Sequence, residues 1–438
     1  MDFLLALNIV DSPILTILKV LSGAALVLLL LRRARHWPQV AAIAVGAGAA
    51  AAVLTLLITD QWLHLFGPPL AWHTRAWTLA LFLGLFLSGA SWWKSRPWRK
   101  VFACCTAVLL LLTATVGINA YYGLNKTVAS LAGISLERPL KLNPVVPHAV
   151  PVNGPPLWKT WAAPADMPSR GTTGTAAIPG TESGFHSRPA GIYLPPAAET
   201  ANPPALPLMV MMMGQPGNPD PQYVAGVLND YAAQHNGLAP IVIVADQLGD
   251  PTVDNLCLDT ALYGHPETYI NKDVVNWASK HLNIIHDRRY WTIAGYSHGG
   301  QCAISFAAKY PQLWGNVLDI SGEEYPGAED PAANLQNVFG GKQAAYDAQK
   351  PVTILGQHHY RDTEAVVTIS SDDGAFLTGA QHVSAAATKA GMKTSYFEIP
   401  NGGHLVRALN EGLQKGFATL YPRLGLSPQP VGAGAGAQ

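Results

Sequence analysis

The chain has 438 residues, more than one ordinary domain, and 49% of them are hydrophobic. Its 28 lysines and arginines equal its 28 aspartates and glutamates, so the formal net charge is zero. A surface balanced in this way cannot neutralise a phosphate backbone, and nucleic acid is therefore excluded as an expected partner.

The first 123 residues contain long apolar segments with few charges. Four of them, at about 12–31, 39–59, 76–93 and 101–122, are each close to the ~20 apolar residues that cross a bilayer. The first could be taken for a signal peptide, but its basic residues follow the apolar stretch and three further segments come after it. We therefore predict an all-α region of four transmembrane helices over residues 1–123.

The basic residues of the short loops predict an orientation. The loops after the first and third segments carry Arg32, Arg33, Arg35, Lys94, Arg96, Arg99 and Lys100, whereas the loop after the second carries only Arg75. Loops rich in lysine and arginine stay in the cytoplasm. We therefore expect a multi-pass protein of the cell membrane, in which the N-terminus and everything after residue 123 are extracytoplasmic.

Three further parts are predicted after the membrane region: a Pro-rich linker over 124–167, a soluble domain over 168–425 and a disordered tail over 426–438. In the domain, short apolar runs such as PIVIVAD, RRYWTIAG and GNVLDISG alternate with helical patterns such as INKDVVNWASKHL. Strands buried on both faces have this composition. The alternation predicts an α/β fold with a mostly parallel sheet flanked by helices.

The four cysteines predict neither a metal site nor a cofactor. None lies in a CxxC motif or in a Cys/His cluster with the spacing of a zinc site. Cys257 and Cys302 fall in the soluble part, where an oxidising compartment permits a disulfide without requiring one. The sequence leaves this pairing open, because it does not give the separation of the two Cα atoms.

A candidate nucleophile follows the apolar run RRYWTIAG. Gly295, Ser297 and Gly299 form a GxSxG motif, and a helical pattern begins near Gln301. Small residues at both glycine positions let a strand turn sharply into a helix, so that the serine hydroxyl projects from the turn. The bare motif is common in a glycine-rich chain, but a strand before it and a helix after it favour Ser297 as a nucleophile over a structural serine.

A serine nucleophile needs a base, and a carboxylate to orient that base. His404 follows the last predicted strand, TSYFEIP, and two glycines, where this fold places its base. Asp373 is the preferred acid, after the run AVVTISS, with Asp372 as the alternative that would otherwise cap the turn. Glu323 and Glu324, after GNVLDISG, are the fallback.

Backbone N–H groups should stabilise the oxyanion that forms during such chemistry. His298 supplies one because it directly follows the nucleophile. The turn Gly214-Gln215-Pro216-Gly217 follows the run MVMMM, and we expect the second N–H to come from Gln215, with Gly214 shaping the approach. The alternative for this segment is a simple tight turn.

The segments LPPA, MMMGQPG, GYSHGGQCAISFAAKYPQLWGNVLDISG, SSDDGAFL and NGGH, in this order, resemble the putative-esterase family of α/β hydrolases. That family includes esterase D (S-formylglutathione hydrolase) and the secreted mycolyltransferases. The resemblance covers about residues 168–425. It implies an α/β-hydrolase fold with Ser297 as nucleophile, Asp373 as acid, His404 as base, and Gln215 and His298 as backbone oxyanion donors. Many members have methionine at position 298, so the histidine implies a more polar acyl pocket.

Three functions are consistent with these expectations. The first is hydrolysis of a lipid or small-molecule carboxylic ester, with a cell-envelope component as substrate because the domain is expected outside the membrane. The second, suggested by the likeness to mycolyltransferases, is acyl transfer to a sugar or lipid hydroxyl by the same groups. The third is an inactive hydrolase-fold binding module, against which a complete set of triad residues in the expected order argues.

Overall fold

The computed structural model describes residues 2–62, 70–134, 136–142 and 154–429. Residues 143–153 of the predicted linker and 430–438 of the predicted disordered tail lie outside the described residues. The chain divides by its internal contacts into two compact units, Met1–Leu136 and Glu137–Gln438. Each unit is described here by itself.

The first unit is a set of four long helices. They are Ile14–Leu30 (α2), Trp37–Leu57 (α3), Trp72–Ala90 (α4) and Pro97–Tyr122 (α5), accompanied by the short helices Asp2–Leu5 (α1) and Val128–Leu131 (α6) and a π-helical turn at Ile58–Trp62 (η1). In the described part of the chain, two helices are long and apolar enough to cross a membrane, Trp37–Asp60 and Pro97–Tyr122. Helix α2 is apolar but has 17 residues. Helix α4 has 19 residues and begins with the polar His73 and Arg75.

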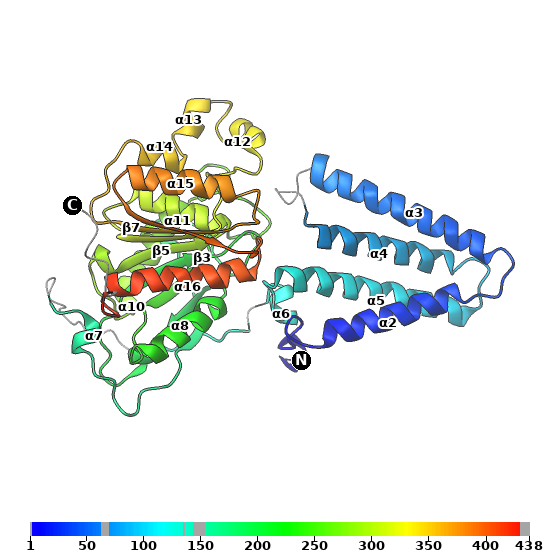
Figure 1. Ribbon diagram of the computed structural model, residues 1–438, viewed down its shortest axis with the longest axis horizontal. Coiled ribbons are helices and arrows are strands. Elements are labelled where there is room, and N and C mark those ends of the chain that lie inside the picture. Colours follow the sequence, from blue (N-terminus) through cyan, green and yellow to red (C-terminus); the bar gives the residue numbers. More distant parts are fainter. Residues whose placement is uncertain (1, 63–69, 135, 143–153, 430–438) are drawn as a thin grey trace. The chain divides into compact units, whose positions relative to one another are not determined.

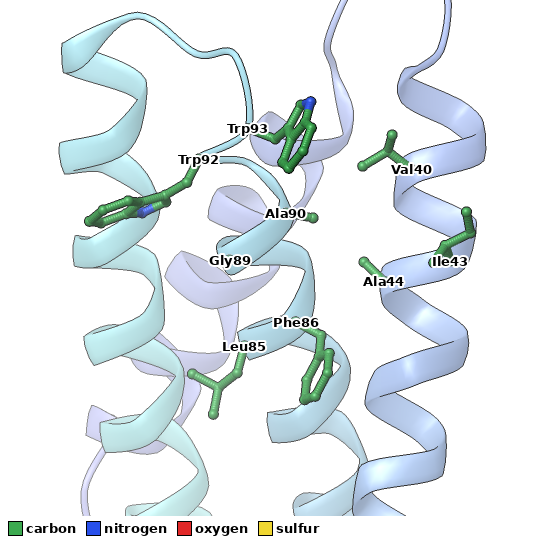
Figure 2. A pocket seen from close by; sticks show the side chains of 9 residues that line it. All are labelled: Val40, Ile43, Ala44, Leu85, Phe86, Gly89, Ala90, Trp92 and Trp93. Carbon is green, nitrogen blue, oxygen red and sulfur yellow. The ribbon is translucent and has the colours of Figure 1, made fainter.

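Few polar contacts join the helices of this unit. The hydroxyls of Ser22 on α2 and Thr113 on α5 are 2.7 Å apart and buried, which satisfies both groups away from water. An apolar pocket of about 840 Å³ lies between α3 and α4; Ile43 and Phe86 are among its lining residues, and Trp93 lies at one end (Figure 2). The residues that line it carry no charged side chain.

The second unit is built around one mixed eight-stranded sheet (Figure 1). The strands are Thr172–Ala176 (β1), Ala190–Leu194 (β2), Leu208–Met212 (β3), Ile241–Ala245 (β4), Trp291–Tyr296 (β5), Asn316–Ile320 (β6), Glu364–Ser370 (β7) and Lys393–Ile399 (β8). Their order is β1-β2-β4-β3-β5-β6-β7-β8. The β1–β2 and β2–β4 pairs are antiparallel, and the pairs from β4 to β8 are parallel. The prediction of a mostly parallel sheet is confirmed.

Helices cover both faces of this sheet, as Figure 1 shows. The helices of the unit are Leu157–Thr160 (α7), Gln222–Gln234 (α8), Pro266–Thr268 (α9), Val275–His281 (α10), His298–Lys309 (α11), Pro331–Asn337 (α12), Gln343–Asp347 (α13), Pro351–Leu355 (α14), Leu377–Lys389 (α15) and Val406–Arg423 (α16), with further turns at Pro196–Glu199, Tyr269–Val274 and Arg288–Tyr290. Helices α8 and α16 lie on one face, and α11 and α15 lie on the other. Strands β3 to β7 are therefore buried on both sides, which explains their nearly continuous apolar sequence.

The alternation of side chains along β6 shows how the two layers meet the sheet. Glycines of α16 lie so close to the strand that a Cβ on Gly416 would be 2.4 Å from Leu318 and one on Gly412 would be 2.6 Å from Ile320. Asp319 points to the opposite face, where a Cβ on Gly300 of α11 would be 2.5 Å from its Oδ1. These glycines let α11 and α16 pack closely against β6, the strand that comes just before one of the loops near the site.

Strand β1 was not predicted from the sequence, and part of the predicted linker lies beside it. The Thr175 N–H donates to the Arg138 carbonyl and the Leu140 N–H donates to the Thr175 carbonyl, both at 2.9 Å. The Trp158 N–H, also within the predicted linker, donates to the Gly425 carbonyl at 3.0 Å. Ordered contacts of this unit therefore begin upstream of residue 168, the predicted start of the domain.

Cys257 and Cys302 form a disulfide with a Cα–Cα separation of 5.6 Å. The bond joins helix α11 to the long segment between β4 and α10, across 45 residues of sequence. The sequence left this pairing open, and the fold supplies the proximity that it requires.

Candidate active site

The site is built at the carboxyl ends of parallel strands, and its central feature is the turn from β5 into α11. Ser297 has φ 56° and ψ −124°, a conformation that side chains rarely adopt and that costs about 1–3 kcal/mol. Its backbone N–H donates to the Ile320 carbonyl at 2.9 Å, and its carbonyl accepts from the Gly300 N–H at 2.8 Å. These bonds hold the strained residue in place at the end of the strand.

The two glycines of the GxSxG motif are required by close contacts within this turn. A Cβ on Gly295 would lie 1.9 Å from the Gly299 carbonyl oxygen, and a Cβ on Gly299 would lie 2.3 Å from the Met212 carbonyl oxygen. Real Cβ atoms do not approach backbone oxygens so closely. Neither position can hold a larger residue unless the turn opens, which agrees with the reason given for the motif from sequence.

Three side chains from separate loops meet at this turn. The His404 Nε2 is 2.7 Å from the Ser297 Oγ, and the His404 Nδ1 is 2.7 Å from the Asp373 Oδ2. Asp373 comes from the loop after β7, and His404 comes from the loop between β8 and α16. Because the carboxylate accepts from Nδ1–H, Nε2 is left to accept the proton of the serine hydroxyl.

The imidazole of His404 is further held by two aromatic rings. It stacks on Phe376, with ring centroids 4.5 Å apart, and on Tyr296, with centroids 5.3 Å apart. The Asp373 side chain is buried, whereas that of His404 is 28% exposed. The ring is thus fixed in orientation while it remains open to an incoming molecule.

The neighbouring aspartate, Asp372, has a different set of partners. Its Oδ1 accepts from the Ser370 hydroxyl at 2.6 Å and from the Gly403 N–H at 2.9 Å. The Ser370 hydroxyl holds the pKa of Asp372 below its usual range, with a further contribution from the Gly403 N–H. Asp372 therefore ties the β7 loop to the loop that carries His404, and it lies on the exposed side of that loop.

The fallback acids lie elsewhere. Glu324 is 3.0 Å from the Nδ1 of His382 on α15. Glu323 is buried, and burial raises its pKa well above the usual value, with the nearby Asp254 and Glu329 carboxyls raising it further. In the described part of the chain, neither residue contacts His404.

The loop after β3 passes directly beside the serine. A Cβ on Gly214 would lie 3.2 Å from the Ser297 Cβ and 3.6 Å from its Oγ, so a glycine keeps this approach clear. The next residue, Gln215, uses its side chain to donate to the Pro251 carbonyl at 3.2 Å. Among the residues that the structure describes, the backbone N–H groups of Gln215 and His298 donate no hydrogen bond.

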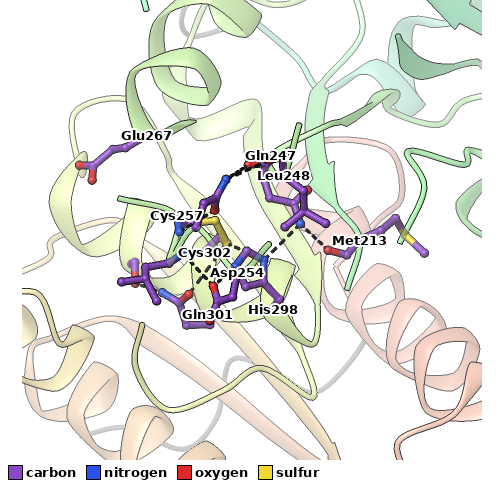
Figure 3. Close-up of a disulfide and its surroundings, with 12 residues drawn as sticks. Met213, Gln247, Leu248, Asp254, Cys257, Glu267, His298, Gln301 and Cys302 are labelled. Atoms are coloured by element: carbon purple, nitrogen blue, oxygen red, sulfur yellow. Dashed lines mark hydrogen bonds and ion pairs between the residues drawn. A yellow bond between two sulfur atoms is a disulfide. The ribbon is translucent and has the colours of Figure 1, made fainter. Parts of the chain in front are cut away.

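The side chain of His298 lies in a buried polar cluster that was not predicted from the sequence (Figure 3). Its Nε2 is 3.1 Å from the Asp254 Oδ1, and its Nδ1 is 3.3 Å from the Gln247 Nε2. Burial raises the pKa of Asp254, but the hydrogen bonds from His298 and from the Leu256 N–H act in the opposite direction, and the pKa lies below its usual range. Gln247 directly follows Asp246 at the carboxyl end of β4. This position was the one feature of the sequence that could have identified Gln247 as a residue of the site.

The carboxyl of Asp319 is buried behind the turn at Ser297. Asp319 on β6 accepts from the Gly322 N–H at 3.0 Å. Burial raises the pKa of Asp319 to about 7, although that hydrogen bond lowers it. The Asp319 carboxyl contacts the backbone after β6 and, among the described residues, forms no hydrogen bond with Ser297 or His404.

One group of potential metal ligands is present among the described residues, and the sequence did not predict it. The ligand atoms of Cys257, His298 and Cys302 lie within 4.8 Å of one another. The two sulfur atoms are bonded to each other in the disulfide, so they are not thiolates and do not fit a metal ion. Nothing in this donor set supports a metal at the site.

Comparisons with known proteins identify the family and the fold of the second unit. A family model described as "Putative esterase" matches residues 186–408. An uncharacterized protein of Corynebacterium glutamicum is 28% identical over 448 residues, which cover 96% of this chain and 98% of that protein. A solved structure of a ferulic acid esterase matches with a TM-score of 0.50 and 17% identity, covering 58% of this chain and 99% of that one. An S-formylglutathione hydrolase from Agrobacterium tumefaciens gives a TM-score of 0.48 and 16% identity, covering 59% and 98%. The α/β-hydrolase-like fold is thereby confirmed, and the C. glutamicum relative is similar across both units.

Proposed function

Since the chain belongs to the putative esterase family of serine hydrolases, we propose that it hydrolyses a carboxylic ester of a lipid or cell-envelope component from a membrane anchor. Ser297, His404 and Asp373 form the catalytic triad in this proposal. It is supported above all by one observation, the continuous hydrogen-bonded series from the Ser297 hydroxyl through His404 to Asp373, with both distances at 2.7 Å. The predicted parts at 1–123, 124–167, 168–425 and 426–438 are retained as its domain organisation.

In the first half of the reaction, the Ser297 Oγ attacks the ester carbonyl while the His404 Nε2 takes the hydroxyl proton. The tetrahedral intermediate collapses when His404 returns that proton to the alkoxy oxygen, so the alcohol leaves and an acyl-serine remains. In the second half, His404 takes a proton from water while the water oxygen attacks the acyl carbon. The second tetrahedral intermediate collapses when His404 returns that proton to the Ser297 Oγ, so the carboxylic acid is released and the serine hydroxyl is restored. Asp373 stays ionised and stabilises the imidazolium in both halves.

The oxyanion of each tetrahedral intermediate needs hydrogen-bond donors that are already in position. We assign this role to the backbone N–H groups of Gln215 and His298. Two observations support the assignment: both groups lack an acceptor within the described residues, and the loop that carries Gln215 passes beside the serine at Gly214. Donors without an acceptor in the resting protein can bind the oxyanion without first breaking another bond.

The anchor in this proposal consists of four transmembrane helices, α2 to α5. Two of them are long and apolar enough to cross a membrane, and α2 and α4 lie in the two other segments predicted as spans. The basic loops around Arg33 and Arg96 would then lie in the cytoplasm, with the catalytic unit outside. A catalytic unit held at that surface encounters esters of lipids and envelope components at high local concentration, which supports this substrate class.

Reporter fusions test the proposed orientation. We expect alkaline phosphatase fused after Gln438 to be active and green fluorescent protein fused there to be dark, since the first folds only outside the cytoplasm and the second only inside. Fusions placed after Arg35 should give the opposite pair of results. A fluorescent C-terminal fusion would contradict the extracytoplasmic location without affecting the proposed chemistry.

Product analysis tests the chemistry itself. The purified full-length protein should release free carboxylic acid from a phospholipid or glycolipid ester presented in mixed micelles. We expect the rate of acid release to be unchanged when a disaccharide acceptor is added. Transfer of the acyl group to the sugar in place of acid release would assign the protein as an acyltransferase, and failure to turn over lipid or short-chain esters would contradict the proposal.

A further inference from the structure

The imidazole of His298 belongs to a chain of hydrogen bonds that reaches from the start of α11 to the loop after β3 (Figure 3). The Gln247 Nε2 donates to the Met213 carbonyl at 2.6 Å and is 3.3 Å from the His298 Nδ1. The His298 Nε2 is 3.1 Å from the Asp254 Oδ1. The side chains of Gln247 and His298 are almost completely buried, with each residue 2% exposed, so these contacts are sheltered from water.

The direction of each bond follows from the first one. A carbonyl oxygen can only accept, so the Gln247 nitrogen beside Met213 is the amide NH₂ group. Its second hydrogen points to the His298 Nδ1, which must therefore be the unprotonated nitrogen of the ring. The Nε2 then carries the hydrogen and donates it to the Asp254 carboxylate. The Gln247 Nε2 and both ring nitrogens of His298 thus have hydrogen-bond partners, as buried polar groups require.

The segment that carries Gln247 and Asp254 is itself fixed to α11. The Asn255 side chain donates to the backbone carbonyl of Gln247 at 2.6 Å and accepts from the Cys257 N–H at 3.1 Å. Cys257 is then bonded to Cys302, which lies one helical turn after His298. The disulfide and the hydrogen bonds thus hold the same short segment against the same turn of helix.

We propose that Gln247 and the His298 imidazole are positioning residues, which set the distance between the backbone N–H groups of Gln215 and His298. This inference rests on the proposed function, because it concerns the two oxyanion donors assigned there. The donors belong to different elements, and Gln247 bridges those elements by contacting Met213 on one side and His298 on the other. Catalytic donors must be held within about 0.5 Å of their productive positions, and Gln247 is one direct hydrogen-bonded bridge between the two elements that carry them.

A bridge with this role affects the transition state more than the bound ester. The oxyanion develops only after attack, so a displaced donor lowers kcat and leaves KM nearly unchanged. A side chain that served packing alone would lower the stability of the protein without this selective effect. Separate values of kcat and KM, together with the affinity for a compound that forms an oxyanion on Ser297, therefore distinguish the two roles.

The experiment compares Gln247→Leu with Gln301→Leu in the full-length protein. Gln301 is an equally buried glutamine on α11 whose side chain donates to Ser305 and, among the described residues, forms no hydrogen bond with Met213 or His298. We expect Gln247→Leu to lower kcat by about tenfold to a hundredfold with KM within about threefold of wild type. The affinity for a trifluoromethyl ketone, which forms an oxyanion on Ser297, should fall by the same factor. Gln301→Leu should keep kcat within about threefold of wild type.

A second pair of variants keeps the test decisive if Gln247→Leu does not fold. An asparagine at position 298 can place its oxygen near the position of Nδ1 and still accept from Gln247, whereas a glutamine reaches the position of Nε2 and keeps only the Asp254 contact. We expect the kcat of His298→Asn to exceed that of His298→Gln by about tenfold.

The outcomes separate this inference from the function on which it rests. Equal kcat values for His298→Asn and His298→Gln, or a Gln247→Leu variant as active as wild type, would overturn the positioning role while the esterase stands. A wild-type protein that turns over no ester and reacts with no trifluoromethyl ketone would instead contradict the proposed function.

Discussion

Replacement of Ser297 by alanine is expected to lower kcat/KM for ester hydrolysis by on the order of 10⁴-fold or more. The acyl-enzyme route requires an oxygen nucleophile at this position, and the Ser297 hydroxyl is the one hydrogen-bond partner of the His404 Nε2 among the described residues, at 2.7 Å. Covalent labelling by a fluorophosphonate probe should disappear with the activity. The measurements are initial rates with a short-chain ester and gel fluorescence after labelling.

The control for this variant is Ser371→Ala, which removes an exposed serine from the loop beside Asp373. Ser371→Ala should keep both the esterase activity and the fluorophosphonate label, because the Ser371 hydroxyl is not one of the groups that connect Ser297 through His404 to Asp373. Labelling that persists in a folded Ser297→Ala protein would show that another residue carries the reactivity. Wild-type protein that folds but resists the probe would favour an inactive module of the same fold.

The second large effect is expected for Asp373→Asn, which should lower kcat by about 10⁴-fold with little change in structure. The carboxylate accepts the Nδ1–H of His404 at 2.7 Å, whereas an amide would present its NH₂ group or leave the tautomer unfixed. The histidine would then be unable to accept the serine proton at Nε2. Activity and thermal unfolding should be measured together, so that the loss can be assigned to chemistry.

Asp372→Asn is the matched control, since it makes the same chemical change at the adjacent residue. Asp372 accepts from the Ser370 hydroxyl and the Gly403 N–H, and an asparagine oxygen can still accept both. We expect its kcat to fall by less than about tenfold. If instead Asp372→Asn were the inactive variant and Asp373→Asn the active one, the assignment of the triad acid would be reversed.

Local sequence was sufficient to predict much of the sheet. The runs PIVIVAD, RRYWTIAG and GNVLDISG correspond to β4, β5 and β6, since a strand covered on both faces must be apolar at nearly every position. The turn at Ser297 was also predictable, because glycine is the only residue type that fits at positions 295 and 299. The placement of His404 and Asp373 relied on their order after successive strands, which all end at one edge of the sheet.

Other features depend on contacts between distant residues, and local sequence did not reveal them. Strand β1 has the sequence TTGTA, without an apolar run, and exists through its pairing with β2. Gln247 meets His298 across 51 residues, and Cys257 meets Cys302 across 45. The four-span prediction was weaker for a different reason: α2 has 17 residues and α4 begins with polar side chains, so length and composition support two spans.

The contact of Arg138 and Leu140 with Thr175 has a practical consequence for shortening the chain. These residues pair with the outer side of β1, whose backbone groups would otherwise be open to a strand from another molecule. A chain cut at residue 168 would lose that cover and expose the Thr175 N–H and C=O to edge-to-edge aggregation, whereas one that begins at Glu137 keeps the sheet margin closed.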